Sequence, residues 1–498
     1  MTPKYFFAKD FYVSSINRAC QLLSVVLIVS LACIAQVRMP DTPAGRQCAA
    51  WLEAFNRGDR EAFRQFLEKN YPSSVERLDR TLQFRSRTGG FELRKIEEST
   101  ETKLVALVQE RSSDQFGRLT LQTEAAEPHR ITSADLQAIP RPAEFSLPHM
   151  SEPELTAALR KQLEQEAAAG SFAGAVLVAR NGKPDFAEAY GFADREHKTP
   201  NTLRTRFRIG SMNKMFTAVA TLQLVQAGKL SINDAVGKYL TDYPNKDIAT
   251  KVTIHELLTH TGGTGDIFGP EFEAHRLELR TLQDYVKLYG ARGPQFEPGS
   301  KWEYSNYGFI LLGVVIEKVS GENYYDYVRE HVYKPAGMTA TGSEPEDQTV
   351  DGRSIGYTKM DSSDWRPNTD TLPYRGSSAG GGYSTVEDLL KFAQALQANK
   401  LLDSHYTELL TTGKPGTPDN SYAYGFGDSK ISGSRCFGHG GGAPGMNGEL
   451  QICPGAGYVV AVLANTDPPA ATRVADFVTN RLPEPTSSGK PERKEKGQ

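Results

Sequence analysis

The sequence lacks any strong excess of charge. Its 57 lysine and arginine residues are balanced by 60 aspartate and glutamate residues, so the formal net charge of the 498 residues is −3. No long stripe of lysine and arginine is present either, so no nucleic-acid partner is predicted. Apolar residues make up 39% of the chain and charged residues 23%. These shares are typical of a globular protein and exclude a fibrous or wholly disordered one.

Long apolar runs are also scarce, and the clearest lies near the N-terminus. Three basic residues precede Ala19–Val37, which carries no charge, and this pattern is typical of a secretory leader. Cys33 and Ala35 would occupy positions −3 and −1 of a cleavage site. Residues 1–35 are therefore predicted to be a signal peptide or, alternatively, a membrane anchor, because a run of this length can just span a bilayer. Either reading predicts a periplasmic, secreted or membrane-anchored protein.

Cysteine is rare, with five residues in the whole chain. Loss of the leader would leave Cys48, Cys436 and Cys453. The last two lie at equal distances from the centre of an apparent β-hairpin, where opposed Cβ atoms are close enough for a disulfide. An oxidising compartment permits such a bond. Two buried thiols are the alternative, and the sequence does not decide between them.

Composition and periodicity divide the rest of the chain into three parts. Residues 44–140 show two helical patterns followed by strand-like runs, which predicts a small α+β accessory domain. This order of elements resembles the NTF2-like fold and favours a structural or docking role. Residues 151–482 form the main predicted domain. Residues 483–498 are charged and rich in proline and glycine, so a disordered tail is expected.

The main domain is predicted to have a sheet built from distant parts of the chain. A helix over 151–168 precedes a hairpin centred on Asn181-Gly182, a strong turn signal. Near the other end, strands are predicted over Gly448–Cys453 and Tyr458–Ala464, followed by a helix over 468–482. The middle is rich in helical patterns. The predicted fold class is α+β, an α/β sandwich whose antiparallel sheet is flanked by the terminal helices, with a mostly helical insertion.

Ser211 and Lys214 form a Ser-x-x-Lys motif that opens an almost continuously apolar helix. Residues three apart share a helix face, so the two side chains would project together. A serine needs a neighbouring base to become a nucleophile, and a buried lysine with a lowered pKa can supply one. By itself the motif is weak evidence for catalysis, since a capping serine beside a solvated lysine would give the same sequence pattern.

Two further motifs strengthen this reading. Tyr304 and Asn306 form a Tyr-x-Asn motif on a loop before an apolar helix, where they would present a phenol and an amide. His439 begins a run of glycines on the first arm of the hairpin near the C-terminus. Glycines at such a place allow a bound substrate to approach the strand backbone closely. Taken singly, Tyr304 could equally be an interface tyrosine, and His439 an ordinary strand histidine.

In this order and spacing, the three motifs resemble the serine β-lactamase and penicillin-binding protein family, in its class C-like branch. A related triplet with Ser-Asp-Asn in second place marks class A enzymes. Further similarity lies in Thr253–Gly263, Phe296–Gly299 and Gly380–Asp388, so that the resemblance covers about 152–482. It implies the β-lactamase/transpeptidase-like fold and a serine hydrolase. The family's activities include D-alanyl-D-alanine carboxypeptidase, D-amino-acid peptidase, esterase and β-lactamase.

The resemblance also implies a role for each residue. Ser211 would attack a carbonyl and form an acyl-enzyme, while Lys214 and Tyr304 share proton transfer, with Tyr304 as the expected base. The backbone N–H groups of Ser211 and Gly442 would form the oxyanion hole, which is usually the largest stabilising contribution. Substrate binding would fall to three further residues: Asn306, which orients the acyl group, His439 and Gly441.

The third motif departs from the family pattern. His439 stands where a lysine is usual, and Gly440 where threonine or serine is usual. These residues help to hold the carboxylate of penicillins and D-alanine termini, whereas a histidine is mostly neutral at pH 7. Efficient β-lactamase activity is therefore not expected, and an esterase or a peptidase of other specificity is favoured. The alternative is a penicillin-type receptor or a catalytically inert binding module.

No cofactor or metal is predicted, and the expected partner is a small-molecule or peptide substrate. His255 and His260 are five residues apart, which does not place them on one helix face, so a zinc motif is rejected. The glycines of 440–445 match a dinucleotide-binding pattern, but no helix is predicted to follow. Ser354 lies in a Gly-x-Ser-x-Gly sequence that lacks the strand and helix of a nucleophile elbow. Nothing in the sequence indicates the oligomeric state.

Overall fold

The computed structural model describes residues 37–360 and 364–483. The predicted leader and almost all of the predicted tail lie outside the described residues. The chain from Met39 onward forms one compact unit, which contains two separate larger sheets, each with a hydrophobic core of its own. Within the described ranges, no helix is both long and apolar enough to cross a membrane.

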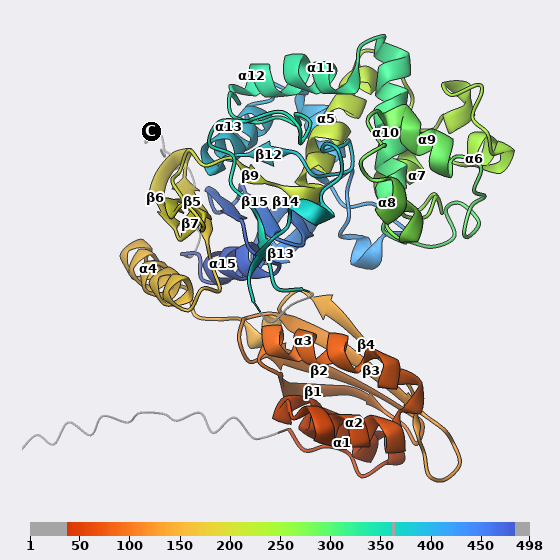
Figure 1. The fold of residues 1–498 in the computed structure, drawn as a ribbon, viewed down its shortest axis with the longest axis vertical. Helices are drawn as coiled ribbons and strands as arrows, with labels where there is room; N and C mark the ends of the chain where they lie inside the picture. Colours follow the sequence, from red (N-terminus) through yellow and green to blue (C-terminus); the bar gives the residue numbers. More distant parts are fainter. Residues whose placement is uncertain (1–36, 361–363, 484–498) are drawn as a thin grey trace, which may run out of the picture. The chain divides into compact units, whose positions relative to one another are not determined.

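The first sheet is an antiparallel meander of four strands in the order β1-β2-β3-β4. Three helices lie against it (Figure 1), and their aromatic side chains, Phe55 and Phe63 among them, fill its core. The strands are β1 Phe91–Ser99, β2 Lys103–Glu110, β3 Phe116–Thr123 and β4 Ile131–Ile139, and the helices are α1 Pro43–Arg57, α2 Arg60–Asn70 and α3 Leu78–Thr88.

Two elements of this part were not predicted. Helix α3 buries only Leu78 and Thr88, and strand β4 buries only Ile131. Such sparse burial leaves almost no hydrophobic period in the sequence, which explains why the pattern did not indicate either element. The helices α1 and α2 and the strands β1–β3 agree with the expected order, and the likeness to the NTF2-like fold stays a prediction.

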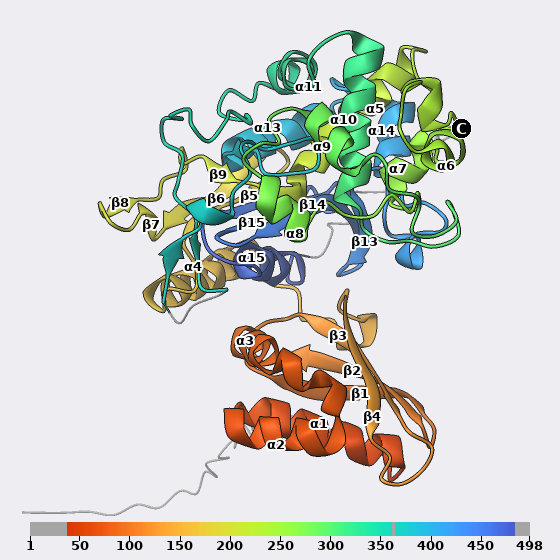
Figure 2. The ribbon, with the colours of Figure 1, turned by 45° about the vertical axis from the view of Figure 1, so that its right-hand side comes forward.

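The second sheet has six antiparallel strands in the order β13-β14-β15-β16-β5-β6. The predicted fold class is confirmed, because strands from 174–190 pair with strands from 427–464 across a long helical insertion. Figure 2 shows β5 and β6 in the same sheet as β15, from which they are far apart in the sequence, and β16 lies between β15 and β5. The strands are β5 Gly174–Arg180, β6 Lys183–Tyr190, β13 Gly427–Ile431, β14 Ser434–Ala443, β15 Met446–Cys453 and β16 Tyr458–Ala464.

Each face of this sheet packs against different helices. On β5, Val176 and Val178 join the cluster of helices α4 and α15, whereas Ala175 and Leu177 face the cluster that contains α5 and α13. Side chains alternate between the faces of a strand, so a continuously apolar strand is buried on both. The helix bounds are α4 Glu152–Ala168, α5 Asn213–Gln226, α13 Val386–Gln397 and α15 Ala470–Thr479.

The insertion between β6 and β13 is mostly helical, as expected, and it places α10 against α5 (Figure 1). Its other helices are α6 Lys246–Lys251, α7 Ile254–Thr259, α8 Pro270–His275, α9 Leu282–Tyr289, α10 Asn306–Ser320, α11 Tyr324–Val328, α12 Lys334–Ala336 and α14 Ser404–Thr411. Its short strands are β7 Phe192–Asp194, β8 Thr199–Pro200, β9 Phe207–Arg208, β10 Tyr357–Thr358, β11 Arg366–Pro367 and β12 Tyr383–Ser384.

Cys436 on β14 and Cys453 on β15 form a disulfide, with their Cα atoms 4.2 Å apart. The register of the two strands pairs Phe437 with Ile452, so the two cysteines stand directly opposite each other. Cys48 is a free, buried cysteine whose thiol has a raised pKa because of that burial.

We expect this disulfide to stabilise the part of the chain that contains the six-stranded sheet. It closes a loop over a sequence separation of 17 residues, and closure of a loop of that size stabilises a protein by about 3 kcal/mol. Replacing both cysteines by serine should therefore lower the midpoint of urea unfolding. Reductant should lower the midpoint of the wild type in the same way and leave the double variant unchanged. Equal midpoints for wild type and double variant without reductant would contradict the expectation.

Candidate active site

Ser211 lies in a short 3₁₀ turn, Gly210–Met212, which leads directly into α5. The serine is partly exposed, whereas nearly every residue of α5 that follows is buried. Gly210 has a positive φ of 51°, and a Cβ there would lie 2.8 Å from the backbone nitrogen of Gly442. A glycine is thus required at the point where this turn meets β14.

Lys214 lies three residues after the serine and is completely buried. Its Nζ is 3.2 Å from Ser211 Oγ, 2.7 Å from Asn306 Oδ1 and 2.6 Å from the carbonyl oxygen of Ala379. Burial lowers the pKa of Lys214 to about 7, although the Asp266 carboxylate acts in the opposite direction. The amine is therefore neutral in a large share of molecules at neutral pH.

Tyr304 lies beside this pair on the loop that precedes α10. The Lys214 Nζ atom is 4.7 Å from the centre of the Tyr304 ring. Burial raises the pKa of Tyr304 far above its usual range, and a hydrogen bond with Ser211 only partly offsets this effect. The phenol therefore carries its proton at neutral pH. This result favours Lys214 over Tyr304 as the group that accepts the serine proton.

Asn306 begins α10, where Ser305 caps the helix by accepting from the N–H of Gly308. Its amide is used on both sides, because Oδ1 accepts from Lys214 and Nδ2 donates to Asp266 Oδ1 at 2.9 Å. Asp266 was not predicted as a site residue. It orients the asparagine so that the oxygen, rather than the nitrogen, faces the lysine.

The open edge of β14 lies next to the serine. Strand β13 pairs with β14 only as far as Gly438, so within the described ranges the stretch from His439 to Ala443 has no strand neighbour on that side. A Cβ at Gly441 would lie 1.9 Å from the carbonyl oxygen of Ile209 and 2.9 Å from the backbone nitrogen of Ser211. The glycine run thus lets the strand approach the turn closely enough to bring the Ser211 and Gly442 amides together.

A different contact explains why glycine stands at position 440. A Cβ at this position would lie 2.4 Å from Glu449 Oε2, on the face of the sheet opposite to His439 and Gly441. Glu449 is 7% exposed, and burial raises its pKa to about 7. The residue that the family pattern expects at position 440 would therefore require the carboxylate of Glu449 to move from its buried place behind the strand.

This contact predicts that Gly440→Thr destabilises the protein through a clash with Glu449. Overpacking of this kind costs about 1–3 kcal/mol. Truncation of the acid in the double variant Gly440→Thr/Glu449→Ala should recover most of the loss, and urea unfolding of the single and double variants measures it. Strictly additive effects of the two substitutions would show that the clash is not the cause.

His439 and His260 both contact Tyr422, a residue that no motif indicated. Tyr422 Oη is 3.1 Å from His439 Nε2 and 3.0 Å from His260 Nε2. Burial lowers the pKa of His439 to about 4, and the pKa of His260 is lowered well below its usual range for the same reason. Both rings are therefore neutral at neutral pH. His255 turns instead to Tyr424, so the two histidines of the rejected zinc pattern have different partners.

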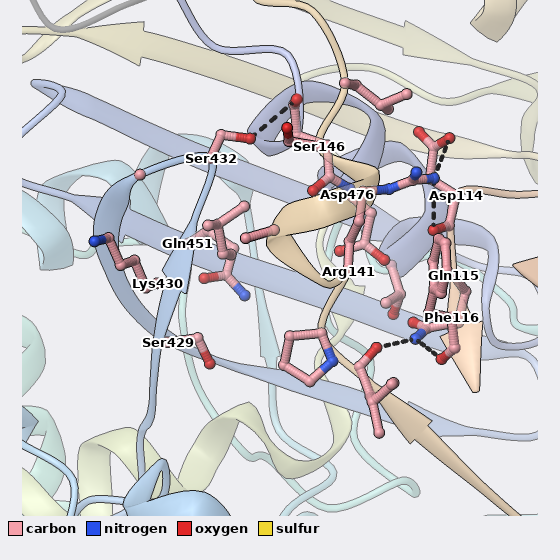
Figure 3. Close-up of a pocket in the computed structure, with 18 of the residues that line it drawn as sticks. Asp114, Gln115, Phe116, Arg141, Ser146, Ser429, Lys430, Ser432, Gln451 and Asp476 are labelled. Carbon is pink, nitrogen blue, oxygen red and sulfur yellow. Dashed lines mark hydrogen bonds and ion pairs between the residues drawn. The ribbon is translucent and has the colours of Figure 1, made fainter. Parts of the chain in front are cut away.

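A cavity of about 740 Å³ lies on the other side of the sheet from Ser211. Its lining includes Glu449 and Gln451, whose side chains are on the face of β15 opposite to the reacting residues. Figure 3 shows Arg141 reaching toward Asp114, with which it forms an ion pair at 3.1 Å. The cavity contains none of the motif residues, so it is separate from the candidate active site.

A family profile described as "Beta-lactamase" matches residues 159–482, more than half of the chain. The chain belongs to the beta-lactamase family. Bacillus subtilis PbpX is 34% identical over 295 residues, which make up 59% of this chain and 70% of PbpX. The resemblance read from the motifs is confirmed at the level of the family.

Solved protein structures also resemble this part of the chain. A penicillin-binding protein from Bacillus halodurans has 34% identity and a TM-score of 0.58, and the match covers 63% of this chain and 97% of that one. A D-stereospecific amidohydrolase from Streptomyces has 29% identity and a TM-score of 0.55, with 66% and 98% of the two chains covered. The family match begins at residue 159, so the four-stranded sheet lies outside it.

The structure thus brings all predicted motif residues of this family member to one place. Four contributors were missed: Asp266, His260, Tyr422 and the carbonyl of Ala379. His260 and Ala379 lie within or beside segments that resembled the family, which was the available signal. Tyr422 and Asp266 had none, because an ordinary tyrosine or aspartate in a loop becomes informative only when its neighbours in space are known.

Proposed function

We propose that this chain is an exported serine hydrolase that acts on an ester or amide through an acyl-enzyme on Ser211. Esterase or D-amino-acid amide and peptide hydrolysis is favoured over β-lactam hydrolysis, because the third motif carries a neutral histidine. The naming of a family member as a D-stereospecific amidohydrolase supports the amide alternative. The uncharged N-terminal run and the disulfide support export, since disulfides persist in oxidising compartments.

The contacts of Lys214 support this proposal most directly. A neutral amine has two N–H groups and one lone pair. The two shortest contacts, to Asn306 Oδ1 and the Ala379 carbonyl, are to acceptors and use both N–H groups. The lone pair is then left for the third contact, the hydroxyl of Ser211. A base with its lone pair aimed at the nucleophile is what acylation requires.

The proposed reaction has two stages. Lys214 takes the proton of Ser211 as the serine oxygen attacks the substrate carbonyl, and the Ser211 and Gly442 amides stabilise the oxyanion. The protonated Tyr304 phenol, beside the serine, donates a proton to the leaving group and is reprotonated from Lys214. In the second stage, water attacks the acyl-enzyme: Tyr304 takes a proton from the water as it passes its own proton to Lys214, and Lys214 returns that proton to the Ser211 oxygen as the acyl bond breaks.

Ser211→Ala should abolish covalent labelling by a fluorescent fluorophosphonate and the hydrolysis of short p-nitrophenyl esters. Ser354→Ala is the matched control, because Ser354 is a buried serine in a Gly-x-Ser-x-Gly sequence but lies in an irregular segment away from the motifs. It should keep both activities. Loss of labelling in Ser354→Ala alone would overturn the assignment of the nucleophile.

The number of turnovers distinguishes an enzyme from a receptor. We expect a panel of short esters, D-amino-acid amides, D-Ala-D-Ala peptides and nitrocefin to include a substrate that the wild type turns over repeatedly and Ser211→Ala does not. A persistent adduct without product release would favour a penicillin-type receptor instead. Uptake of neither a penicillin nor a fluorophosphonate probe, with no ester cleaved, would reject the proposal.

The pKa of Lys214 predicts the pH dependence. The neutral amine is the active form, so kcat/KM should be level above pH 7 and fall about tenfold per pH unit below it. Asp266 raises the pKa of Lys214, so Asp266→Asn should move the midpoint of this fall to lower pH. A midpoint that moves upward in this variant, or does not move, would show that Lys214 is not the group that titrates.

A further inference from the structure

Four hydrogen bonds join the Tyr304 loop to strand β14 through the side chains of His260, Tyr422 and His439. The backbone N–H of Ser305 lies 3.1 Å from His260 Nδ1, and His260 Nε2 lies 3.0 Å from Tyr422 Oη. Tyr422 Oη lies 3.1 Å from His439 Nε2, and His439 Nδ1 contacts the carbonyl oxygen of Gly440. The second and third motifs are thus linked by a continuous chain.

The two ends of this chain fix the direction of every bond in it. The Ser305 amide can only donate, so His260 Nδ1 accepts and the proton of that ring sits on Nε2. The Gly440 carbonyl can only accept, so His439 carries its proton on Nδ1 and its Nε2 accepts. Tyr422 then receives a hydrogen bond from His260 and donates its own proton to His439.

Protonation of His439 would disrupt this alternation of hydrogen-bond donors and acceptors. A proton on Nε2 would face the Tyr422 hydroxyl, which could not turn to His260 because that ring already presents its own N–H. Among the described residues, the charged and titratable groups around His439 are Lys214, His260, Tyr304 and Tyr422. None of them supplies a negative charge, and Lys214 lowers the pKa of His439 further. The carboxylate of Asp266 acts on Lys214 and Tyr304 instead.

We propose that Tyr422 is a positioning residue that holds His439 as a neutral ring protonated on Nδ1, and thereby excludes substrates whose leaving group carries a carboxylate. Both nitrogens of His439 are occupied within the protein, so the ring offers neither a positive charge nor a free N–H to the substrate. This inference rests on the proposed function for the identity of the substrate, but the state of the histidine is independent of it.

The state of His439 can be measured without any substrate. We would record ¹⁵N NMR spectra of the full-length protein labelled at its nine histidines, with assignments from His439→Gln and His260→Gln. His439 of the wild type should show the Nδ1-protonated form and stay neutral at pH 6. In Tyr422→Phe its titration midpoint should rise by about one pH unit, because the donor that stabilises the neutral ring is lost.

Tyr424→Phe is the matched control. Tyr424 and His255 form a similar pair, with Oη 2.8 Å from Nδ1, but this pair does not reach the motifs. The control should leave the midpoint of His439 unchanged. An Nε2-protonated ring in the wild type, an unchanged midpoint in Tyr422→Phe, or an equal shift in both variants would overturn the proposal.

Substrate choice is tested with two butanoate esters, 3-(butanoyloxy)benzoate, whose leaving group carries a carboxylate, and its uncharged methyl ester, with release of the phenol as the readout. The wild type should hydrolyse the methyl ester with a kcat/KM at least tenfold higher. This preference should shrink between pH 8 and pH 5 in Tyr422→Phe but not in Tyr424→Phe. Equal kcat/KM values for the two esters in the wild type would overturn the exclusion of carboxylates. If the wild type cleaves neither ester, the proposed function fails for esters, while the NMR result still decides the role of Tyr422.

Discussion

The arrangement of the site depends on the burial of one amine. Lys214 lies on the first turn of a helix that is buried almost throughout, and its pKa falls to about 7 because water is excluded. The surrounding polar groups are placed accordingly: Asn306 and the Ala379 carbonyl accept its two N–H groups, and Asp266 holds Asn306 in the matching orientation. A solvated lysine at the same position would stay charged and could not take a proton from serine.

The six-stranded sheet separates two different environments. Its inner face carries Gly441 and His439 next to the nucleophile, and its outer face carries Glu449 beside α15 and a large cavity. Because side chains alternate along a strand, neighbouring residues on β14 face opposite sides of the sheet and contact different groups. Gly441 is required by the approach of the turn that holds Ser211, whereas a side chain at position 440 would displace the buried carboxylate of Glu449. One glycine run thus has two physical causes.

Much of the fold could be read from the sequence wherever burial was strong. The strand β16 is apolar throughout and β5 is apolar as far as its last residue, Arg180, while α4 carries its capping box at Ser151. These elements were therefore predicted nearly to the residue. Helix α3 and strand β4 bury very little and were missed. Sequence patterns were limited in the same way at the site. They predicted the residues that belong to motifs but not Asp266 or Tyr422, which belong to none.

By itself, the sequence determined the family, the fold class and the three motifs, because these depend on residue types at short spacings along the chain. Only the tertiary structure decided how the protons are arranged. Whether Lys214 is neutral, whether Tyr304 keeps its proton and which nitrogen of His439 is protonated all follow from burial and from partners brought from distant segments. Desolvation and hydrogen-bond direction are properties of a packed environment, and no local pattern encodes them.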